Sequence, residues 1–376
     1  MELLVTLFLC GDVMTGRGID QILPHPGDPT LHESFVRNAR QYVELAEREN
    51  GRIEKPVDFA YIWGDALEVL ERIQPDLRII NLETSVTISD NHWRGKGIHY
   101  RMHPHNAKCL TAADIDCCVL ANNHVLDWGY GGLVETIETL EGLNIAPVGA
   151  GRNAEATSKP TVLNLAGSYS KTRVIIFAYG SPTAGVSEQW APGRMRPGVN
   201  LLTDLSDKTC DAVCDAIRRQ TRDGDVVIFS VHWGGNWGYE ISDEQQRFAR
   251  RLIDRGGVDV VYGHSSHHVK GIEVYRDRLI LYGCGDFLND YEGIGGHEGF
   301  RPDLTLMYLP TLDAETGALK RLRLVPMQVK RMRLNHADQS DAVWLGNVLT
   351  RLSVGSPVRY QAGDDGVISA RWPGRE

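Results

Sequence analysis

Residues 3–12, LLVTLFLCGD, form an apolar, β-rich run that ends in a glycine and an aspartate. Four later runs of this kind also end in polar motifs, which are, in order, Asn81-Leu82-Glu83, Asn122-Asn123-His124, His232-Trp233-Gly234 and Gly263-His264-Ser265-Ser266-His267. Short apolar runs are typical of buried strands, and the ends of such strands hold side chains rigidly at one edge of a sheet. The motifs together predict one metal-centred acid/base site.

The composition is that of an ordinary soluble globular protein. The chain has 376 residues, of which 42% are hydrophobic and 24% are charged, so it can bury a sizeable core. Its net charge of −9 argues against a nucleic-acid-binding protein. The net charge is compatible with a local basic pocket for an anionic substrate, and Arg17, Arg101 and Arg301 are candidates for it.

The N-terminal run MELLVTLFLC carries an acidic residue at Glu2, has no basic segment and is too short to cross a membrane. We therefore predict that it is the first strand, and that the protein is cytoplasmic and does not bind membranes. The seven cysteines show no CxxC pair or zinc-site spacing, so we expect buried, reduced thiols.

Strand-like runs alternate with helical patterns along most of the chain, which predicts an α/β fold. Amphipathic helices are predicted over residues 57–74, 131–141, 206–220 and 242–255. The last of these has the strongest boundary signal, because Ser242 and Gln245 form a capping-box pair.

From about residue 258, short strands follow one another without helices between them, which predicts an antiparallel second sheet or sheet edge. Two packed sheets flanked by helices would follow. Segments 24–56 and 84–106 are rich in Pro, His, Asn and Gly, so we expect them to cross over the site. We predict a catalytic domain over residues 1–330, with a C-terminal helix and a fraying polar tail over residues 331–376 packed on it.

Two carboxylates end predicted strands. Asp12 can bind a cation or act as a base, but it can equally cap the next helix. Burying Glu83 at a strand end without a cation or a donor would be costly, which favours a ligand role over a solvated strand end.

The motif Asn122-Asn123-His124 offers a neutral oxygen ligand at Asn123 and an imidazole suited to proton transfer near neutral pH. Asp127, three residues later, can orient that imidazole. An Asx turn beside an ordinary surface histidine is the alternative.

Histidines end the last two predicted strands. His232 precedes glycines that would let a ligand approach, while Trp233 and Trp237 fit pocket walls and core packing equally well. His264 and His267 lie three residues apart, a spacing that lets two imidazoles point at one metal ion.

The glycine-rich stretch GCGDFLNDYEGIGGHEGFRPD contains Asp286, Asn289, Asp290 and His297. Its glycines indicate a loop that approaches another group closely, and His297 with a nearby carboxylate would form a second acid/base pair. An ordinary surface loop with an incidental histidine is the alternative.

Taken in order, GDVMTGRG, NLE, ANNHVLDWG, HWG, GHSSHHVKGIE and GCGDF resemble the CapA (poly-γ-glutamate capsule synthesis) family of calcineurin-like metallophosphoesterases. The resemblance covers roughly residues 5 to 310. It implies a four-layer α/β/β/α sandwich with mixed sheets and a metal at the strand ends. It also implies His124 as the acid/base residue and these metal ligands: Asp12, Glu83, Asn123, His232, His264 and His267.

The chain departs from the metallophosphoesterase pattern at the metal motifs. The usual Asp-x-His is Asp12-Val13-Met14, and Asn81-Leu82-Glu83 replaces the bridging aspartate motif. A complete two-metal site is therefore not expected, since an imidazole is lost from one centre. A single hard cation (Ca²⁺, Mg²⁺ or Mn²⁺, with Zn²⁺ as an alternative) suits carboxylate and amide oxygens.

Within this family the length and the Gly-Gly-His loop resemble lasso-peptide epimerases, which invert the C-terminal residue of a ribosomal precursor peptide. Our leading hypothesis is therefore a metal-assisted epimerase of such a peptide, and proton transfer would involve Asp12, His124, Asp127, His297 and Asp286. Substrate binding would involve Arg17, Arg101, Trp233 and Trp237. The alternatives are a metal-dependent phosphoesterase or amide hydrolase, and a non-catalytic factor of polymer synthesis.

Overall fold

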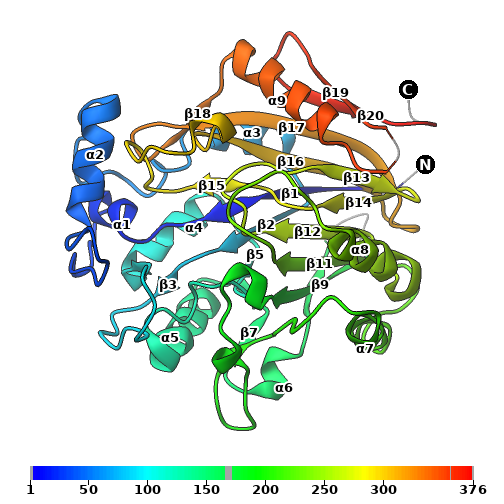
Figure 1. Ribbon diagram of the computed structural model, residues 1–376, viewed down its shortest axis with the longest axis horizontal. Helices are drawn as coiled ribbons and strands as arrows, with labels where there is room; N and C mark the ends of the chain where they lie inside the picture. Colours follow the sequence, from blue (N-terminus) through cyan, green and yellow to red (C-terminus); the bar gives the residue numbers. More distant parts are fainter. Residues whose placement is uncertain (1–2, 166–171, 356, 375–376) are drawn as a thin grey trace.

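Two mixed β-sheets pack face to face, and helices cover the outer face of each sheet (Figure 1). The computed structural model describes residues 3–165, 172–355 and 357–374. The predicted four-layer α/β/β/α sandwich with mixed sheets is confirmed. The first two residues of the predicted N-terminal strand lie outside the described residues.

The larger sheet has ten strands. In spatial order its main path is β19 (Arg359–Ala362), β20 (Ile368–Arg371), β17 (Leu319–Val329), β16 (Leu304–Asp313), β1 (Leu4–Val13), β2 (Leu77–Leu82), β5 (Cys117–Val119) and β6 (Ala146–Val148). Two further strands join this path at its side, namely β15 (Asp286–Leu288), which pairs with β1, and β18 (Leu334–His336), which pairs with β17. Strands β15, β1, β2, β5 and β6 are parallel, so their carboxyl ends meet at one edge.

The second sheet has six strands. Their order is β13 (Ile272–Tyr275), β14 (Arg278–Leu281), β12 (Val260–His264), β11 (Val226–His232), β9 (Arg173–Gly180) and β8 (Thr161–Asn164). Short two-stranded pairings join β3 (Ser85–Val86) to β4 (Arg101–Met102) and β7 (Ala150–Gly151) to β10 (Gly198–Val199).

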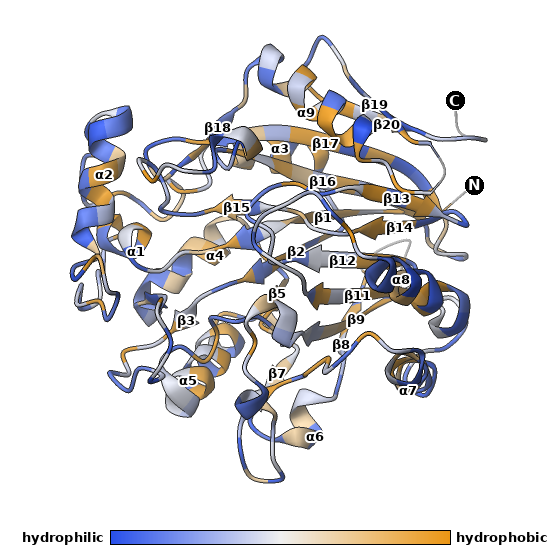
Figure 2. Ribbon diagram, viewed as in Figure 1, coloured by the Kyte–Doolittle hydropathy of each residue, from blue (hydrophilic) through white to orange (hydrophobic). Residues whose placement is uncertain are grey.

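Apolar side chains fill three layers. Leu7 and Ile79 of the first sheet meet Ile228 and Val260 of the second in the core between the sheets. The outer face of the first sheet packs on α1 (Gly18–Ile22), α2 (Arg40–Asn50), α3 (Ala66–Ile73), α4 (Lys108–Ala112) and α5 (Gly129–Gly142). The outer face of the second packs on α7 (Asp207–Arg218) and α8 (Asp243–Gly256), whose solvent sides are hydrophilic in Figure 2.

The predicted strand and helix segments are largely confirmed. The apolar runs that precede the five motifs form β1, β2, β5, β11 and β12. Helices α5, α7 and α8 match their predicted ranges, and α8 has the predicted Ser242/Gln245 capping box. Only the second half of the predicted helix 57–74 is helical, as α3, and residues before Ala66 form turns.

The prediction of an antiparallel second sheet or sheet edge after residue 258 is confirmed only for the edge. Strand β12 is parallel to both β11 and β14, and only the hairpin of β13 and β14 continues the second sheet in antiparallel fashion. The chain then crosses to the first sheet at β15, where β16 and β17 form a long antiparallel pair. Short strands without intervening helices reflect this crossing.

The expected excursions are more ordered than their composition indicated. Segment 24–56 contains α2, and segment 84–106 contains β3 and β4. In place of a fraying tail, the C-terminal segment contains α9 (Gln339–Arg351) and the strands β19 and β20 of the larger sheet. A short helix α6 (Ala154–Thr157) precedes β8.

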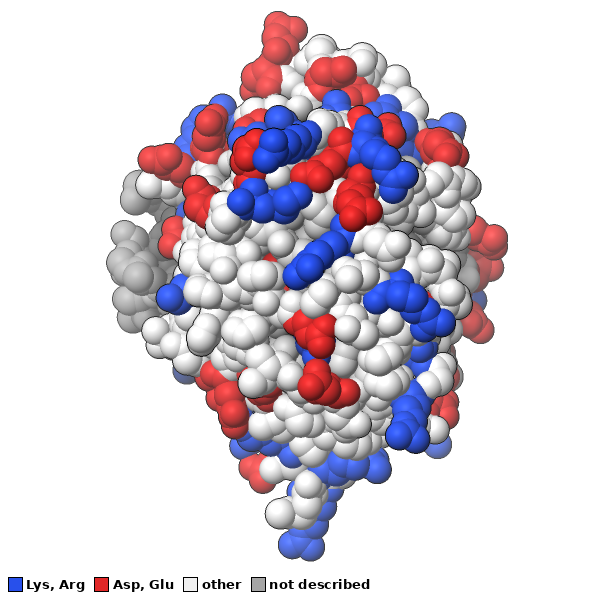
Figure 3. Space-filling model, turned by 90° about the vertical axis from the view of Figure 1, so that its left-hand side faces the viewer, with Lys and Arg blue, Asp and Glu red and all other residues white. Residues whose placement is uncertain are grey.

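The described helices include none that is both long and apolar enough to cross a bilayer. The side of the molecule that carries α2 shows acidic and basic side chains intermixed (Figure 3).

A tyrosine ties the two sheets together through the backbone of β1. The Tyr262 hydroxyl accepts a hydrogen bond from the Cys10 amide at 3.2 Å and donates one to the Cys10 carbonyl oxygen. Tyr262 is fully buried on β12, and β1 is irregular in its pairing with β2 just beyond Leu9. The hydroxyl therefore satisfies backbone groups immediately before Asp12.

We expect Tyr262→Phe to lower the free energy of unfolding by about 1–3 kcal/mol, because it leaves buried backbone groups unsatisfied. Urea denaturation would measure the change. Tyr275→Phe is the matched control, since its hydroxyl binds Asp254 at an exposed position. Equal stability of the two variants would contradict the bridging role of Tyr262.

Candidate metal centre and acid/base site

The predicted polar residues converge at the carboxyl edge of the parallel strands. Along the first sheet, Asp286 on β15 lies beside Asp12 on β1, and Asp12 lies beside Asn81 on β2. Glu83 follows β2, and its amide donates to the Val13 carbonyl oxygen at 3.0 Å. These side chains therefore form a row that follows the strand order.

A glycine lets β15 approach β1. The Asp12 amide donates to the Gly285 carbonyl oxygen at 2.9 Å, and a Cβ on Gly11 would lie only 1.9 Å from that oxygen. A side chain at position 11 would thus push the strands apart. The glycine before the first motif places Asp286 next to Asp12.

Three buried side chains are arranged to hold a cation. Ligand atoms of Asp12, Glu83 and His232 all lie within 4.8 Å of one another. The Asp12 carboxylate accepts hydrogen bonds from the Asn81 amide at 2.7 Å and the Ser265 backbone amide at 3.2 Å. Glu83 Oε2 and His232 Nδ1 are buried and find no hydrogen-bond partner in the described part of the chain, as fits a site whose remaining interactions are made to a metal ion.

The electrostatics of this cluster favour a bound cation. Burial and the neighbouring Asp286 carboxylate raise the pKa of Asp12 to about 7. Burial and the Asp12 carboxylate raise the pKa of Glu83 well above its usual range. Burial and the nearby imidazole of His264 lower the pKa of His232, so its ring is held neutral, as metal binding requires.

The other predicted ligands lie around this cluster. Asn123 Oδ1 is 3.1 Å from His232 Nε2. His264 is buried at the end of β12, where its Nε2 lies 2.9 Å from the Ser230 hydroxyl. Its Nδ1 has no hydrogen-bond partner among the described residues and lies 3.5 Å from Asp12 Oδ1, facing the cluster.

The predicted His124/Asp127 pair forms beside the cluster. His124 Nδ1 lies 2.6 Å from Asp127 Oδ2, and His124 Nε2 lies 3.7 Å from Glu83 Oε1. Burial lowers the pKa of His124 to about 4 despite the opposing charge of Asp127. Because the carboxylate can only accept, Nδ1 donates to Asp127 and the Nε2 lone pair faces the cluster.

The Asx turn that was the alternative interpretation of this motif also forms, at Asn122. Asn122 Oδ1 accepts from the amides of His124 and Val125 at 3.1 Å, and its side-chain amide donates to Asn81 Oδ1 at 3.0 Å. The turn therefore positions His124, and the two interpretations of the motif are compatible.

Lys96 is a site residue that sequence reasoning missed. Its half-buried ammonium group contacts the carboxylate of Asp127, the carbonyl oxygen of Asn123 and, at 3.0 Å, Nδ1 of His124. It lies in the crossing segment 84–106, where no strand end or periodic pattern marked it. The expectation that this segment covers the site was the available signal.

His267 lies apart from the metal cluster. Its Nδ1 is 2.8 Å from Asp286 Oδ1, and its Nε2 is 3.1 Å from the Asn236 side-chain amide. Burial lowers the pKa of His267, but the Asp286 carboxylate outweighs that effect and the net pKa is raised. With both ring nitrogens engaged, His267 forms a second His/Asp pair in this structure.

The predicted acid/base pair of His297 with a nearby carboxylate, for which Asp286 and Asp12 were candidates, does not form among the described residues. His297 is exposed, and its ring stacks on Trp237 with centroids 3.7 Å apart. His267 occupies the place next to Asp286 because it follows β12, whose end faces β15 and β1. A glycine-rich sequence does not determine where the side chains of the loop lie. The sequence therefore could not show which of the two histidines pairs with Asp286.

The predicted substrate-binding arginines are already neutralised. Arg17 is buried, donates to Glu33 at 2.8 Å and to Asp290, and lies over the Tyr42 ring at 3.9 Å. Arg101 donates to Asp90 at 2.8 Å and stacks on Trp128. Neither guanidinium is free to anchor a carboxylate.

The two tryptophans predicted as pocket walls or core residues have different roles, because one packs in the core and the other lines a pocket. Trp233 belongs to the outer core of the second sheet, and its indole donates to the Tyr282 carbonyl oxygen at 3.0 Å. Trp237 lines a pocket together with His267 and His297. Arg301 also lines this pocket but is paired with Asp303 and Asp341 at 2.8 and 2.9 Å.

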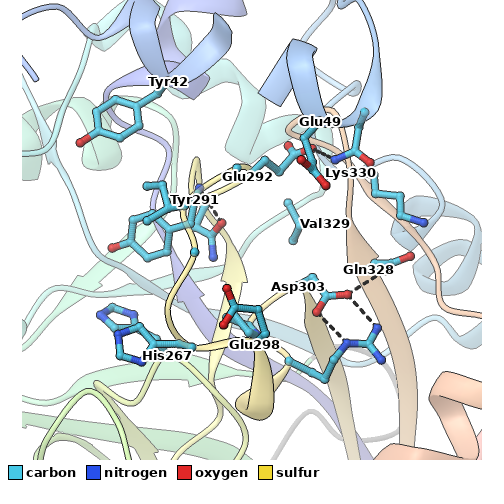
Figure 4. A pocket seen from close by; sticks show the side chains of 18 of the residues that line it. Tyr42, Glu49, His267, Tyr291, Glu292, Glu298, Asp303, Gln328, Val329 and Lys330 are labelled. Carbon is cyan, nitrogen blue, oxygen red and sulfur yellow. Dashed lines mark hydrogen bonds and ion pairs between the residues drawn. The ribbon is translucent and has the colours of Figure 1, made fainter. Parts of the chain in front are cut away.

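The pocket has a volume of about 700 Å³ and opens beside the second His/Asp pair. Figure 4 shows His267 and Tyr291 on one side of it and Gln328 and Lys330 on the other. Apolar groups such as Ile98 and Ile294 also line it, so a peptide-sized ligand would find both polar and apolar contacts.

Comparison with known proteins agrees with this geometry. Residues 6–291 match the family described as "Bacterial capsule synthesis protein PGA_cap". The chain belongs to the PGA_cap family. The match covers all the residues of the cluster and both His/Asp pairs, so the site is built within the family region.

The chain is similar to proteins named for polyglutamine synthesis and to proteins named for capsule or PGA biosynthesis. The chain is 47% identical over 365 residues to the "Probable polyglutamine synthesis accessory protein" of Mycobacterium tuberculosis (strain H37Rv), covering 97% of this chain and 95% of the relative. It is 24% identical over 286 residues to "Capsule biosynthesis protein CapA" of Bacillus anthracis, covering 76% of this chain and 60% of that protein. It is 26% identical over 281 residues to "PGA biosynthesis protein CapA" of Bacillus subtilis (strain 168), covering 74% and 62%.

We expect the metal-free protein to lose stability as the pH rises from about 4 to about 7. The folded-state pKa of Asp12 is raised from 3.8 to about 7, and that of Glu83 is also raised. Between the unfolded and the folded pKa, the folded state binds more protons than the unfolded state. The stabilisation that is present below the unfolded pKa is therefore lost as the pH rises through the folded pKa. Thermal denaturation in a chelator at pH 4 to 8 would measure the effect, a few °C per proton by rough scaling.

Glu83→Gln should make this pH profile shallower, and the exposed Glu244→Gln control should leave it unchanged. Adding a divalent cation should raise the melting temperature of the wild type most at pH 8. A Glu83→Gln profile identical to that of the wild type would rule out the coupled carboxylates as its source.

Proposed function

We propose that this protein is a metal-dependent hydrolase that acts on the amide bonds of a peptide-like polymer. One observation carries the proposal, namely that the buried cluster of Asp12, Glu83 and His232 lies directly beside the His124/Asp127 pair. A cation site next to an oriented imidazole is the arrangement that metal-assisted hydrolysis uses.

The side chains divide the chemistry between them. Asp12, Glu83 and His232 would hold a divalent cation, which supplies Lewis acidity toward a carbonyl or phosphoryl oxygen when bound. His124 holds its Nε2 lone pair toward the cluster, where it can take a proton from water and return it to the leaving group. Asp127 orients the imidazole, and Lys96 balances the charge of that aspartate.

The substrate class rests on the relatives. Their printed names refer to polyglutamine synthesis and to PGA and capsule biosynthesis, which supports an amide-linked polymer over a phosphoester. The pocket of about 700 Å³ is lined by His267 of the second His/Asp pair, and it is large enough for several residues of such a chain.

The first test is incubation of the metal-loaded protein with oligoglutamate in α and γ linkage, with oligoglutamine and with a generic phosphodiester. We expect cleavage of an amide substrate that stops on chelation. Glu83→Gln and His124→Asn should each lower kcat by at least about a hundredfold, because they remove the cation site and the acid/base group. Glu244→Gln is the matched control.

Turnover of the phosphodiester alone would move the substrate class to phosphoesters. Metal-independent cleavage, or full activity of Glu83→Gln, would contradict the proposal. Metal binding without turnover of any of these substrates would favour a non-catalytic factor of polymer synthesis.

A second candidate is epimerisation at Cα of the C-terminal residue of a ribosomal, lasso-type peptide. The observation that favours it is the second pair, His267 with Asp286, at the opposite end of the row from His124 with Asp127. Inversion needs one group to remove the Cα proton and another to deliver one from the other face. Two His/Asp pairs flanking a cation site meet that need.

Incubation of candidate peptides in D₂O, followed by mass spectrometry, tests this second function. Epimerisation predicts a one-dalton gain at the terminal residue that is lost in both His124→Asn and His267→Asn. An uncut, unlabelled peptide that demonstrably binds would exclude it, and a peptide cut in two would favour the hydrolase.

A further inference from the structure

A group of arginines covers the outer face of the larger sheet near its edge. We call it the arginine face, and its members are Arg72, Arg321, Arg323, Arg359 and Arg371. Arg72 lies in the last turn of α3, and the others lie on β17, β19 and β20. In Figure 1 these strands lie at the end of the sheet where α9 and the C-terminus are found.

Strand alternation places these side chains together. On β17, Leu322 and Leu324 point into the core between the sheets, so Arg321 and Arg323 point outward. On β20, Ile368 points into the same core, and Ser369 and Arg371 share the outward face. Register completes the group, since Arg323 pairs with Ser369 and Arg359 pairs with Arg371.

The arginines lack acidic partners. Within the described part of the chain, none of the five guanidinium groups forms an ion pair or a hydrogen bond. Arg323 Nε is inaccessible to solvent and has no partner. Burial, together with the adjacent charges of Arg321 and Arg72, lowers the pKa of Arg323 against the opposing charge of Asp365.

Arg323, the half-buried member of the group, differs in this respect from three other buried or half-buried arginines. Arg17, Arg173 and Arg250 are each paired with a carboxylate within 3 Å. The chain has 49 acidic residues against 40 basic ones, so partners are abundant. A guanidinium group held close to others of its kind without a counter-ion is costly, and an external anion would relieve that cost.

The arginine face contains a pocket of about 580 Å³. Arg72, Arg323 and Arg371 line it together with the polar side chains of Gln361 and Ser369. Asp365 is the acidic residue of the lining, and its carboxylate accepts from the Val367 amide at 3.1 Å. Guanidinium, amide and hydroxyl donors in a concave surface are the groups that bind carboxylates.

We propose that the arginine face binds an extended anionic chain that carries repeated carboxylates, such as an acidic peptide. Residues 321 and 323 present charges about 7 Å apart along one strand, the spacing at which an extended peptide presents alternate side chains. The pocket lining contains no aromatic ring among the described residues, so it offers no platform on which nucleic-acid bases would stack.

This site is separate from the metal cluster. Strand β17 lies two strands from β1, and Arg323 pairs with Leu309, whose strand pairs with β1 near Leu9 rather than near Asp12. The arginine face also lies on the helix-covered side of the sheet, beyond the end of α3. Binding here is therefore independent of the proposed chemistry.

Fluorescence anisotropy with labelled hexa-L-glutamate, in the presence of a chelator, tests the proposal. We expect salt-sensitive binding that falls at least about tenfold in Arg323→Gln/Arg371→Gln, because each substitution removes a charge-assisted contact. The single variant Arg371→Gln, at an exposed position, should show a smaller loss and guards against misfolding. The matched control is Arg247→Gln, an exposed arginine on α8, which should bind as the wild type does.

Arg323→Gln/Arg371→Gln should keep the rise in melting temperature that a divalent cation gives the wild type, which separates this site from the metal cluster. Wild-type affinity in Arg323→Gln/Arg371→Gln would overturn the proposal. So would equal binding of hexa-L-glutamine, or tighter binding of an oligothymidine of the same length, which would indicate a nucleic-acid surface instead.

Discussion

The Asp12 and Glu83 carboxylates are buried side by side with neutral hydrogen-bond donors around them. Elsewhere near the site, negative charge is balanced within the protein: Lys96 pairs with Asp127, and Arg17 pairs with Asp290 and Glu33. The strand-end pair is thus left for a cation to neutralise. Burial and the neighbouring imidazole of His264 keep His232 neutral beside this pair, as metal binding requires. The Nε2 atom of His124 lies 3.7 Å from Glu83 Oε1, so the His124/Asp127 pair faces the same carboxylates.

Much of this arrangement is predictable from local patterns. Asp12, Glu83 and His232 follow apolar runs, and a buried strand leaves its terminal side chain little freedom of position. The pair of His124 and Asp127 is equally local, because three residues and one turn separate them. The fold followed for the same reason, since strand and helix periodicities mark the layers directly.

The remainder depends on long-range packing that short patterns do not encode. Lys96 reaches the site from a segment without regular periodicity, and His267 takes the place expected of His297 because β12 and β15 are brought together by the sheets. Arg17 looked like a substrate anchor only because Glu33 and Asp290, which neutralise it, are far away in sequence. A charge can be read from a sequence, but its counter-ion often cannot.

The crossing of the chain between sheets at β15 also constrains how the protein can fold. Asp286 reaches the row only after the chain has completed β11 to β14 in the second sheet and returned to pair with β1. The contact joins residues separated by more than two-thirds of the chain. Closing such a long loop costs conformational entropy, so we expect this contact to form late in folding. A nascent chain therefore lacks both the carboxylate beside Asp12 and the His267/Asp286 pair until about three-quarters of its 376 residues have been synthesised.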